Sequence, residues 1–267
     1  MDKRNRNLLI GIAVLIVVLC CCAIAIVASV WIAVRADRGL TEVHFFEFDL
    51  DSQVQAEQSF AVGENPYLDL GSFAGKVTVR AGEGNLIHVV AIKKAPSESA
   101  LNRISVAMNQ EGDGVVVRTS KQNNLNNATV DLEVTAPTNT ELQLNTGAGS
   151  IEIRGMTGSI DAHSGAGSIS VSGARGPAKL GVGAGSIRYQ GTPAGRCSFE
   201  SGAGEINIRL PANPDVRLDL NTGLGTISVG YDVDGSISPR KVTGEIGDGS
   251  EASIYANTGV GSISVMP

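Results

Sequence analysis

The sequence is poor in the side chains on which most enzymes and nucleic-acid-binding proteins depend. Aromatic residues make up 4% of the 267 residues, and the chain has only three histidines, His44, His88 and His163, which lie far apart. The net charge is −6, and no stretch beyond the first six residues is strongly cationic. Because phosphate binding requires clustered Lys and Arg, this composition argues against a nucleic-acid partner. It also weighs against catalysis.

Cysteine is scarce and badly placed for disulfides. Cys20, Cys21 and Cys22 lie together in an apolar run, and Cys197 is alone in the rest of the chain. A disulfide-stapled secreted scaffold is therefore excluded. Cys197 alternates with Phe199 in Arg-Cys-Ser-Phe-Glu, which predicts a strand with both side chains in the core.

Residues 8–34 form a run of 27 residues without a charge, whereas about 20 suffice to span the hydrocarbon core. Lys3, Arg4 and Arg6 precede the run and favour a cytoplasmic N-terminus over residues 1–7. A cleaved signal peptide is the competing interpretation, but its apolar region normally has about 7–15 residues. We expect a single transmembrane helix in the lipid bilayer of a bacterial cell membrane. Cleavage of the anchor and modification of its cysteines stay open.

A polar juxtamembrane linker follows over residues 35–58, and an extracytoplasmic β domain over residues 59–267. Apolar residues alternate from Ser59 onward, with short strands between glycine-rich turns. One short helix is expected near residues 97–103, where Ser97 is the candidate N-cap. The segment Glu111-Gly-Asp-Gly114 predicts a hairpin turn.

A Gly-x-Gly-x-Ile repeat dominates the second half of the chain. Its second glycine falls at positions 149, 167, 185, 204, 225 and 261, with gaps of 18, 18, 19, 21 and 36 residues. The last gap suggests a drifted unit around Gly244, with an insertion near residues 231–240. Gly75 lies 74 residues before Gly149, which corresponds to about four more periods.

Each repeat contains two short alternating stretches that cannot bury an apolar face alone but can do so by stacking on the next repeat. Glycine at a fixed phase suits corners with positive φ. Eighteen residues are too few for a repeat containing a helix. The sequence therefore predicts an all-β fold, an elongated β-helix or β-roll-like solenoid of undetermined handedness.

The apolar N-terminal run, the short strands and the segment Val134-Thr-Ala-Pro-Thr-Asn-Thr-Glu-Leu-Gln-Leu-Asn-Thr-Gly-Ala-Gly-Ser-Ile-Glu-Ile resemble the bacterial putative-adhesin domain of unknown function, also called the toastrack domain. The resemblance covers about residues 60–265. It implies a β-helix-like extracytoplasmic domain on a membrane anchor, associated with cell-envelope stress systems. The family offers no established catalytic residues for this chain.

Candidate sites in the sequence have simpler explanations. The Gly-Ala-Gly-Ser motif lacks the lysine and the following helix of a phosphate loop. The turns also lack the aspartates of calcium-binding β-rolls. Asp131 and Glu133 share one polar strand face, and Glu152, Asp161 and Glu205 fall at differing phases of the repeat. We therefore expect no catalytic, cofactor-binding or metal-binding residue.

The sequence predicts a non-catalytic, membrane-anchored binding or scaffold module in envelope stress sensing or surface adhesion. Its partner would be an envelope membrane protein, or a surface glycan or protein. The alternative is a glycan-active β-helix lyase or hydrolase, which needs two carboxylates about 5–10 Å apart on one face. A further hypothesis is self-association through a terminal rung formed by the last repeat, which runs to Val265-Met-Pro267.

Overall fold

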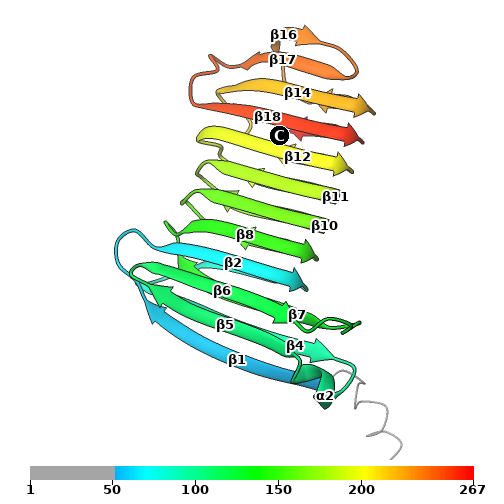
Figure 1. Ribbon diagram of the computed structural model, residues 1–267. Coiled ribbons are helices and arrows are strands. Elements are labelled where there is room, and N and C mark those ends of the chain that lie inside the picture. Colours follow the sequence, from blue (N-terminus) through cyan, green and yellow to red (C-terminus); the bar gives the residue numbers. More distant parts are fainter. Residues whose placement is uncertain (1–51) are drawn as a thin grey trace, which may run out of the picture. The chain divides into compact units, whose positions relative to one another are not determined.

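The computed structural model describes residues 52–267, which form nineteen strands and one short helix (Figure 1). The strands are β1 (Ser52–Ala61), β2 (Tyr67–Ala74), β3 (Val77–Gly82), β4 (Leu86–Ala95), β5 (Ile104–Glu111), β6 (Gly114–Lys121), β7 (Thr129–Pro137), β8 (Glu141–Ala148), β9 (Ile151–Arg154), β10 (Ile160–Ala174), β11 (Ala178–Gly191), β12 (Gly195–Ala203), β13 (Ile206–Arg209), β14 (Val216–Leu224), β15 (Ile227–Val229), β16 (Asp234–Ile237), β17 (Lys241–Ile246), β18 (Ala252–Val260) and β19 (Ile263–Met266). The helix is α2 (Glu98–Leu101). The all-β class is as predicted.

The expected cytoplasmic segment 1–7, the transmembrane helix 8–34 and most of the linker lie outside the described residues. Strand β1 begins at Ser52, within the segment 35–58 predicted as a linker, and pairs along its whole length with β4. No helix within residues 52–267 is long and apolar enough to cross a membrane.

Two parallel layers run through the middle of the fold. We call the first layer the row β2, β8, residues 160–166 of β10, residues 178–184 of β11, then β12, β18 and β14. The second layer is the row β3, β9, residues 169–174 of β10, residues 187–191 of β11, then β13, β19 and β15. Because β10 and β11 pass through both layers, hydrogen bonds join all nineteen strands into one mixed sheet.

Glycine corners connect the layers. At Gly167 the backbone has φ +141°, and a Cβ there would collide with the carbonyl oxygen of Gly149 on the neighbouring strand. The first glycine of the corner is equally constrained, since a Cβ on Gly165 would lie 2.5 Å from the carbonyl oxygen of Gly147. Backbone therefore stacks directly on backbone, and both positions require glycine.

Gly75 occupies the corner next to Gly149 rather than one four periods away. The Gly75 amide donates to the carbonyl of Ala148 at 3.0 Å, and β2 and β3 pair directly with β8 and β9. The segment between Gly75 and Gly149 therefore contains no hidden repeats. Residues 86–137 within this segment form strands β4 to β7 and α2. Strands β6 and β7 continue the two layers by pairing in parallel with β2 and β3, and β5 and β4 then pair antiparallel with β6 and β7.

The last repeat of the sequence does not lie at the end of the stack. Strand β18 pairs with β12 on one side and β14 on the other, and β19 lies between β13 and β15 in the same way. Figure 1 shows β18 between β12 and β14. The last repeat, which was expected to form a terminal rung, is therefore paired on both sides through β18 and residues 263–265 of β19, which removes the basis for self-association through it.

The region around Gly244 is not a drifted repeat. Strand β17 runs antiparallel to β14, and β16 pairs antiparallel with β17. These two strands form a hairpin that ends the first layer beyond β14. The insertion expected at residues 231–240 provides its first strand.

Local predictions near the N-terminal end agree with the structure. The Ser97 hydroxyl accepts a hydrogen bond from the Ala100 amide at 3.3 Å and caps α2. Strands β5 and β6 form the expected hairpin, in which Gly112 supplies the positive φ of 60°.

Alternation along the strands produces one apolar core. Leu, Ile and Val fill it, and Cys197 and Phe199 are fully buried as predicted. The first layer also buries a row of small polar side chains immediately before the glycine corners. They are Ser72, Thr146, Ser164, Ser201, Thr258 and Thr222, with Val182 in the same row.

Candidate functional site: a cationic groove on the second layer

Two of the carboxylates singled out in the sequence, Asp131 and Asp161, are held in separate ion pairs, whereas Glu133 and Glu205 form none within the described residues. Asp131 accepts a hydrogen bond from the Lys76 amide and contacts the Lys94 ammonium, both at 2.8 Å. Asp161 contacts His163 at 2.9 Å and Lys179 at 3.3 Å. Such pairs fix strand neighbours and leave the carboxylates engaged.

The structure does not bring Glu152, Asp161 and Glu205 together. Asp161 faces outward from the first layer, whereas Glu152 belongs to β9 and Glu205 immediately precedes β13, both in the second layer. Glu152 binds the Lys76 ammonium at 2.8 Å and the Arg154 guanidinium. Hydrogen bonds from Lys76 and Arg154 lower the pKa of Glu152, which keeps it ionised.

No group of three or more His, Cys, Asp or Glu residues suited to a metal ion occurs in the described part of the chain. Four acids line a hollow of about 680 Å³ beside the terminal hairpin. Its acids are Asp215, Asp232, Asp234 and Glu245. Asp215 accepts from the Asp248 amide at 3.0 Å, and Glu245 pairs with Arg217 at 2.6 Å.

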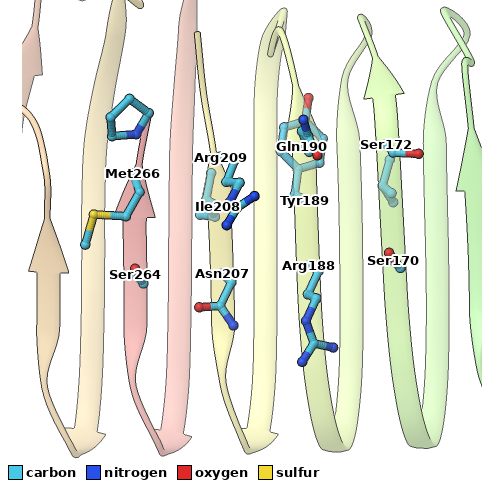
Figure 2. Close-up of a pocket in the computed structure, with 12 residues that line it drawn as sticks. Ser170, Ser172, Arg188, Tyr189, Gln190, Asn207, Ile208, Arg209, Ser264 and Met266 are labelled. Carbon is cyan, nitrogen blue, oxygen red and sulfur yellow. The ribbon is translucent and has the colours of Figure 1, made fainter. Parts of the chain in front are cut away.

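A groove of about 400 Å³ crosses the outward face of β10, β11, β13 and β19 in the second layer (Figure 2). Two rows of outward side chains border it, because residues aligned across parallel strands lie side by side. One row contains Ser170, Arg188, Asn207 and Ser264. The other contains Ser172, Gln190, Arg209 and Met266.

The groove carries two guanidinium groups and no carboxylate side chain. Arg188 donates to the Ser186 hydroxyl at 3.0 Å, and Arg209 makes no side-chain hydrogen bond or ion pair within residues 52–267. Both residues are exposed. The neighbouring Arg154, in contrast, is paired with Glu152, which also binds Lys76. The positive charge of the groove is therefore available to a ligand.

The floor beneath Arg188 and Gln190 includes Tyr189, which is 1% exposed. Its ring packs against Phe199 at a centroid distance of 5.1 Å, and its hydroxyl has no hydrogen-bond partner. Burial, with a smaller contribution from Cys197, raises the pKa of Tyr189 well above its ordinary value. The floor is therefore uncharged, and Tyr189 offers no exposed ring face for stacking.

A second hollow, of about 320 Å³, lies on the first layer and differs in charge. Glu141 and Asp161 line it together with Lys179 and Arg196. Its cations therefore have carboxylates beside them, in contrast to those of the second-layer groove.

The groove was not predicted from the sequence, although the repeat contains a signal for it. Arg188 is the third residue after Gly185, and Arg209 is the fifth after Gly204. Aligning the repeats by their second glycine puts Ser170, Arg188 and Asn207 in one row, as observed. The contribution of Ser264 and Met266 depends on the insertion of β19, which the repeat spacing does not indicate.

The fold and groove define an all-β protein with two parallel layers and an outward polar surface. No protein-family model matches the chain, and no curated protein matches it either. Among solved structures, the chain is similar to a "putative cell adhesion protein" from Clostridium sporogenes, with a TM-score of 0.51 and 19% identity over 80% of this chain and 99% of the other. A "putative adhesin" from Bacteroides fragilis has a TM-score of 0.38 and 13% identity over 80% and 98%. The former likeness establishes a shared fold.

Proposed function

We propose that this protein is a non-catalytic, membrane-anchored extracytoplasmic binding module whose paired layers form a β-solenoid. The observation that carries the proposal is the groove on the second layer, where unpaired cations and neutral polar groups face outward from fully paired strands. A rigid surface with side chains at fixed intervals suits broad contacts with an extended partner. The adhesion-like fold of the Clostridium sporogenes protein supports a role at the cell surface.

The anchor in this proposal is the uncharged run of residues 8–34, with residues 1–7 in the cytoplasm. It would hold the β domain outside a bacterial cell membrane. Both surface adhesion and envelope stress sensing are compatible with this arrangement, since each needs a stable, exposed β surface. The toastrack resemblance favours the envelope, and the likeness in fold favours adhesion.

Cross-linking on intact cells that express the full chain separates these roles. Captured material is identified by mass spectrometry, and a chain that ends at Asp51 is the control for capture by the anchor alone. Recovery of a specific membrane protein with the full chain supports a sensor or scaffold. Recovery of cell-wall or foreign surface material supports adhesion. Identical recovery with both chains contradicts a binding role for the β domain.

A glycan-active enzyme is the alternative, and the acidic hollow beside the terminal hairpin favours it. Asp232 and Asp234 line that hollow, and neither forms an ion pair within the described residues. Release of new reducing ends from a polysaccharide by the full chain, abolished by Asp234→Asn, would support this alternative. Intact polymer after prolonged incubation would support the binding module.

A further inference from the structure

The unpaired arginines of the second-layer groove restrict what it can bind. Arg188 and Arg209 lie on neighbouring strands, offset by one strand spacing and two residues, so their Cα atoms are about 8 Å apart. The carboxylate nearest in sequence, Glu205, precedes β13 and does not line the groove. A guanidinium binds carboxylate through paired N–H groups in a planar fork. Two such groups at a fixed separation suit a ligand with regularly spaced anions.

The remaining polar side chains suit a ligand rich in hydroxyl groups. Ser170, Ser172 and Ser264 each provide a hydroxyl that can donate and accept, and Gln190 and Asn207 provide amides with both functions. They surround the two arginines in the same two rows. Figure 2 shows them distributed along neighbouring strands rather than around one point. This distribution favours an extended ligand over a compact one.

Two other polymers fit the groove poorly. Nucleic acid is bound through clustered cations and stacking aromatic rings, and the only aromatic residue in the groove is the buried Tyr189. An extended peptide usually adds to a free strand edge, but β10, β11, β13 and β19 are paired on both sides. Of the apolar residues that line the groove, Val171, Tyr189 and Ile208 are buried, and Met266 and Pro267 lie on the last strand, β19, or directly after it.

We propose that the second-layer groove binds a linear polysaccharide with carboxylate groups, such as a polyuronate, through Arg188 and Arg209. The arginines hold successive carboxylates, and the serine, asparagine and glutamine side chains bond to the sugar hydroxyls. This inference rests on the proposed binding function and specifies the ligand class of the same groove.

The test measures binding of polygalacturonate to the full-length chain in detergent micelles. The variant is Arg188→Gln combined with Arg209→Gln. The matched control is Lys179→Gln combined with Arg196→Gln, which removes the same charge from the first-layer hollow. Methyl-esterified polygalacturonate is the neutral version of the same polymer, and dextran sulfate tests whether carboxylate is required. Thermal unfolding verifies that all variants are folded.

We expect the groove variant to weaken polygalacturonate binding at least tenfold and the control variant to change it less than twofold. The methyl ester should bind measurably to none of the three proteins. For the unmodified chain, 0.5 M NaCl should weaken polygalacturonate binding, because exposed charges are screened. Tighter binding of dextran sulfate than of polygalacturonate would identify sulfate rather than carboxylate as the preferred anion, and would overturn the assignment. Equal losses in both variants, or undiminished binding of the methyl ester, would also overturn it.

The same samples separate this inference from the proposed function. If polygalacturonate does not bind while intact cells still yield a specific cross-linked partner, only the ligand assignment fails. If the polymer binds through the arginines and is then depolymerised, the ligand class stands and the non-catalytic function fails. Chain length of the polymer, measured before and after incubation, distinguishes these results.

Discussion

The two parallel layers share one strand register but present different charges to solvent. The strands of the first layer carry three cations and five carboxylates, a net charge of −2, whereas those of the second carry four cations and one carboxylate, a net charge of +3. The first set is Lys179, Arg196, Arg217, Asp69, Glu141, Asp161, Glu200 and Asp219; the second is Arg80, Arg154, Arg188, Arg209 and Glu152.

This difference separates what stacking dictates from what it leaves free. Inward residues and corner glycines must match their neighbours, because backbone and core side chains contact the next strand directly. Outward residues meet mainly solvent and the adjacent row. A charge bias on one outward face of a protein with net charge −6 therefore carries information about binding rather than folding. Substitutions of the corner glycines should therefore destabilise both layers. Substitutions of outward side chains should leave the stability of the fold nearly unchanged.

The largest effect is expected at a corner. A Cβ in Gly185→Ala would collide with the Gly167 carbonyl oxygen at a backbone φ of +141°, so we expect a loss of about 4 kcal/mol or more. Gly84→Ala is the control, because Gly84 also has a positive φ, +81°, but open space around a new Cβ; it should cost about 1–2 kcal/mol. Denaturant unfolding measures both. Equal losses would mean that close backbone approach contributes nothing.

A smaller effect, of opposite sign, is expected beneath the groove. The Tyr189 hydroxyl is buried without a partner, so Tyr189→Phe should stabilise the fold by about 1 kcal/mol at neutral pH. Burial raises the folded-state pKa of Tyr189, so the unfolded state loses its proton first as pH rises above about 10. The unmodified chain should therefore lose stability in that alkaline range, and the variant should lose less. Parallel pH profiles would contradict this account.

The buried polar row of the first layer permits a comparison within one layer. The Thr258 hydroxyl donates to the Gly204 carbonyl at 3.2 Å, whereas the Thr146 hydroxyl has no partner. Thr258→Val should destabilise by about 1 kcal/mol, and Thr146→Val should be neutral or stabilising. Val182 already occupies this row, so the shape of valine fits there. Chemical denaturation of the two variants in parallel gives the difference; a larger loss for Thr146→Val would refute this assignment of hydroxyl partners.

The sequence could predict features that depend on neighbours along the chain better than features that depend on contacts between distant segments. Alternation and glycine phase indicated the strands and the burial of Cys197 with Phe199, and a local helix-start signal indicated the cap at Ser97, because these depend on neighbours along the chain. The insertion of β18 between β12 and β14, and the pairing of β2 with β8, depend on contacts between distant segments. Spacing alone therefore misassigned Gly75 and Gly244. The groove was missed in part for the same reason: Ser170, Arg188 and Asn207 follow the repeat spacing, but Ser264 and Met266 join them only through the insertion of the distant strand β19.

The smallest effect is expected on the outward face of the second layer. Glu152 is 21% exposed, but its partners Lys76 and Arg154 are 52% and 56% exposed, so the pairs should contribute about 0.2–1 kcal/mol. Lys76, followed by Arg154, lowers the folded-state pKa of Glu152, so this contribution is present above the ordinary glutamate pKa and is lost as pH falls through the lower folded value. Glu152→Gln should remove that pH dependence and leave Arg154 unpaired. If outward charges serve binding, the variant should also bind polygalacturonate more tightly than the unmodified chain, with little change in unfolding temperature. A large loss of stability, or weaker polymer binding, would instead mean that Glu152 belongs to the framework.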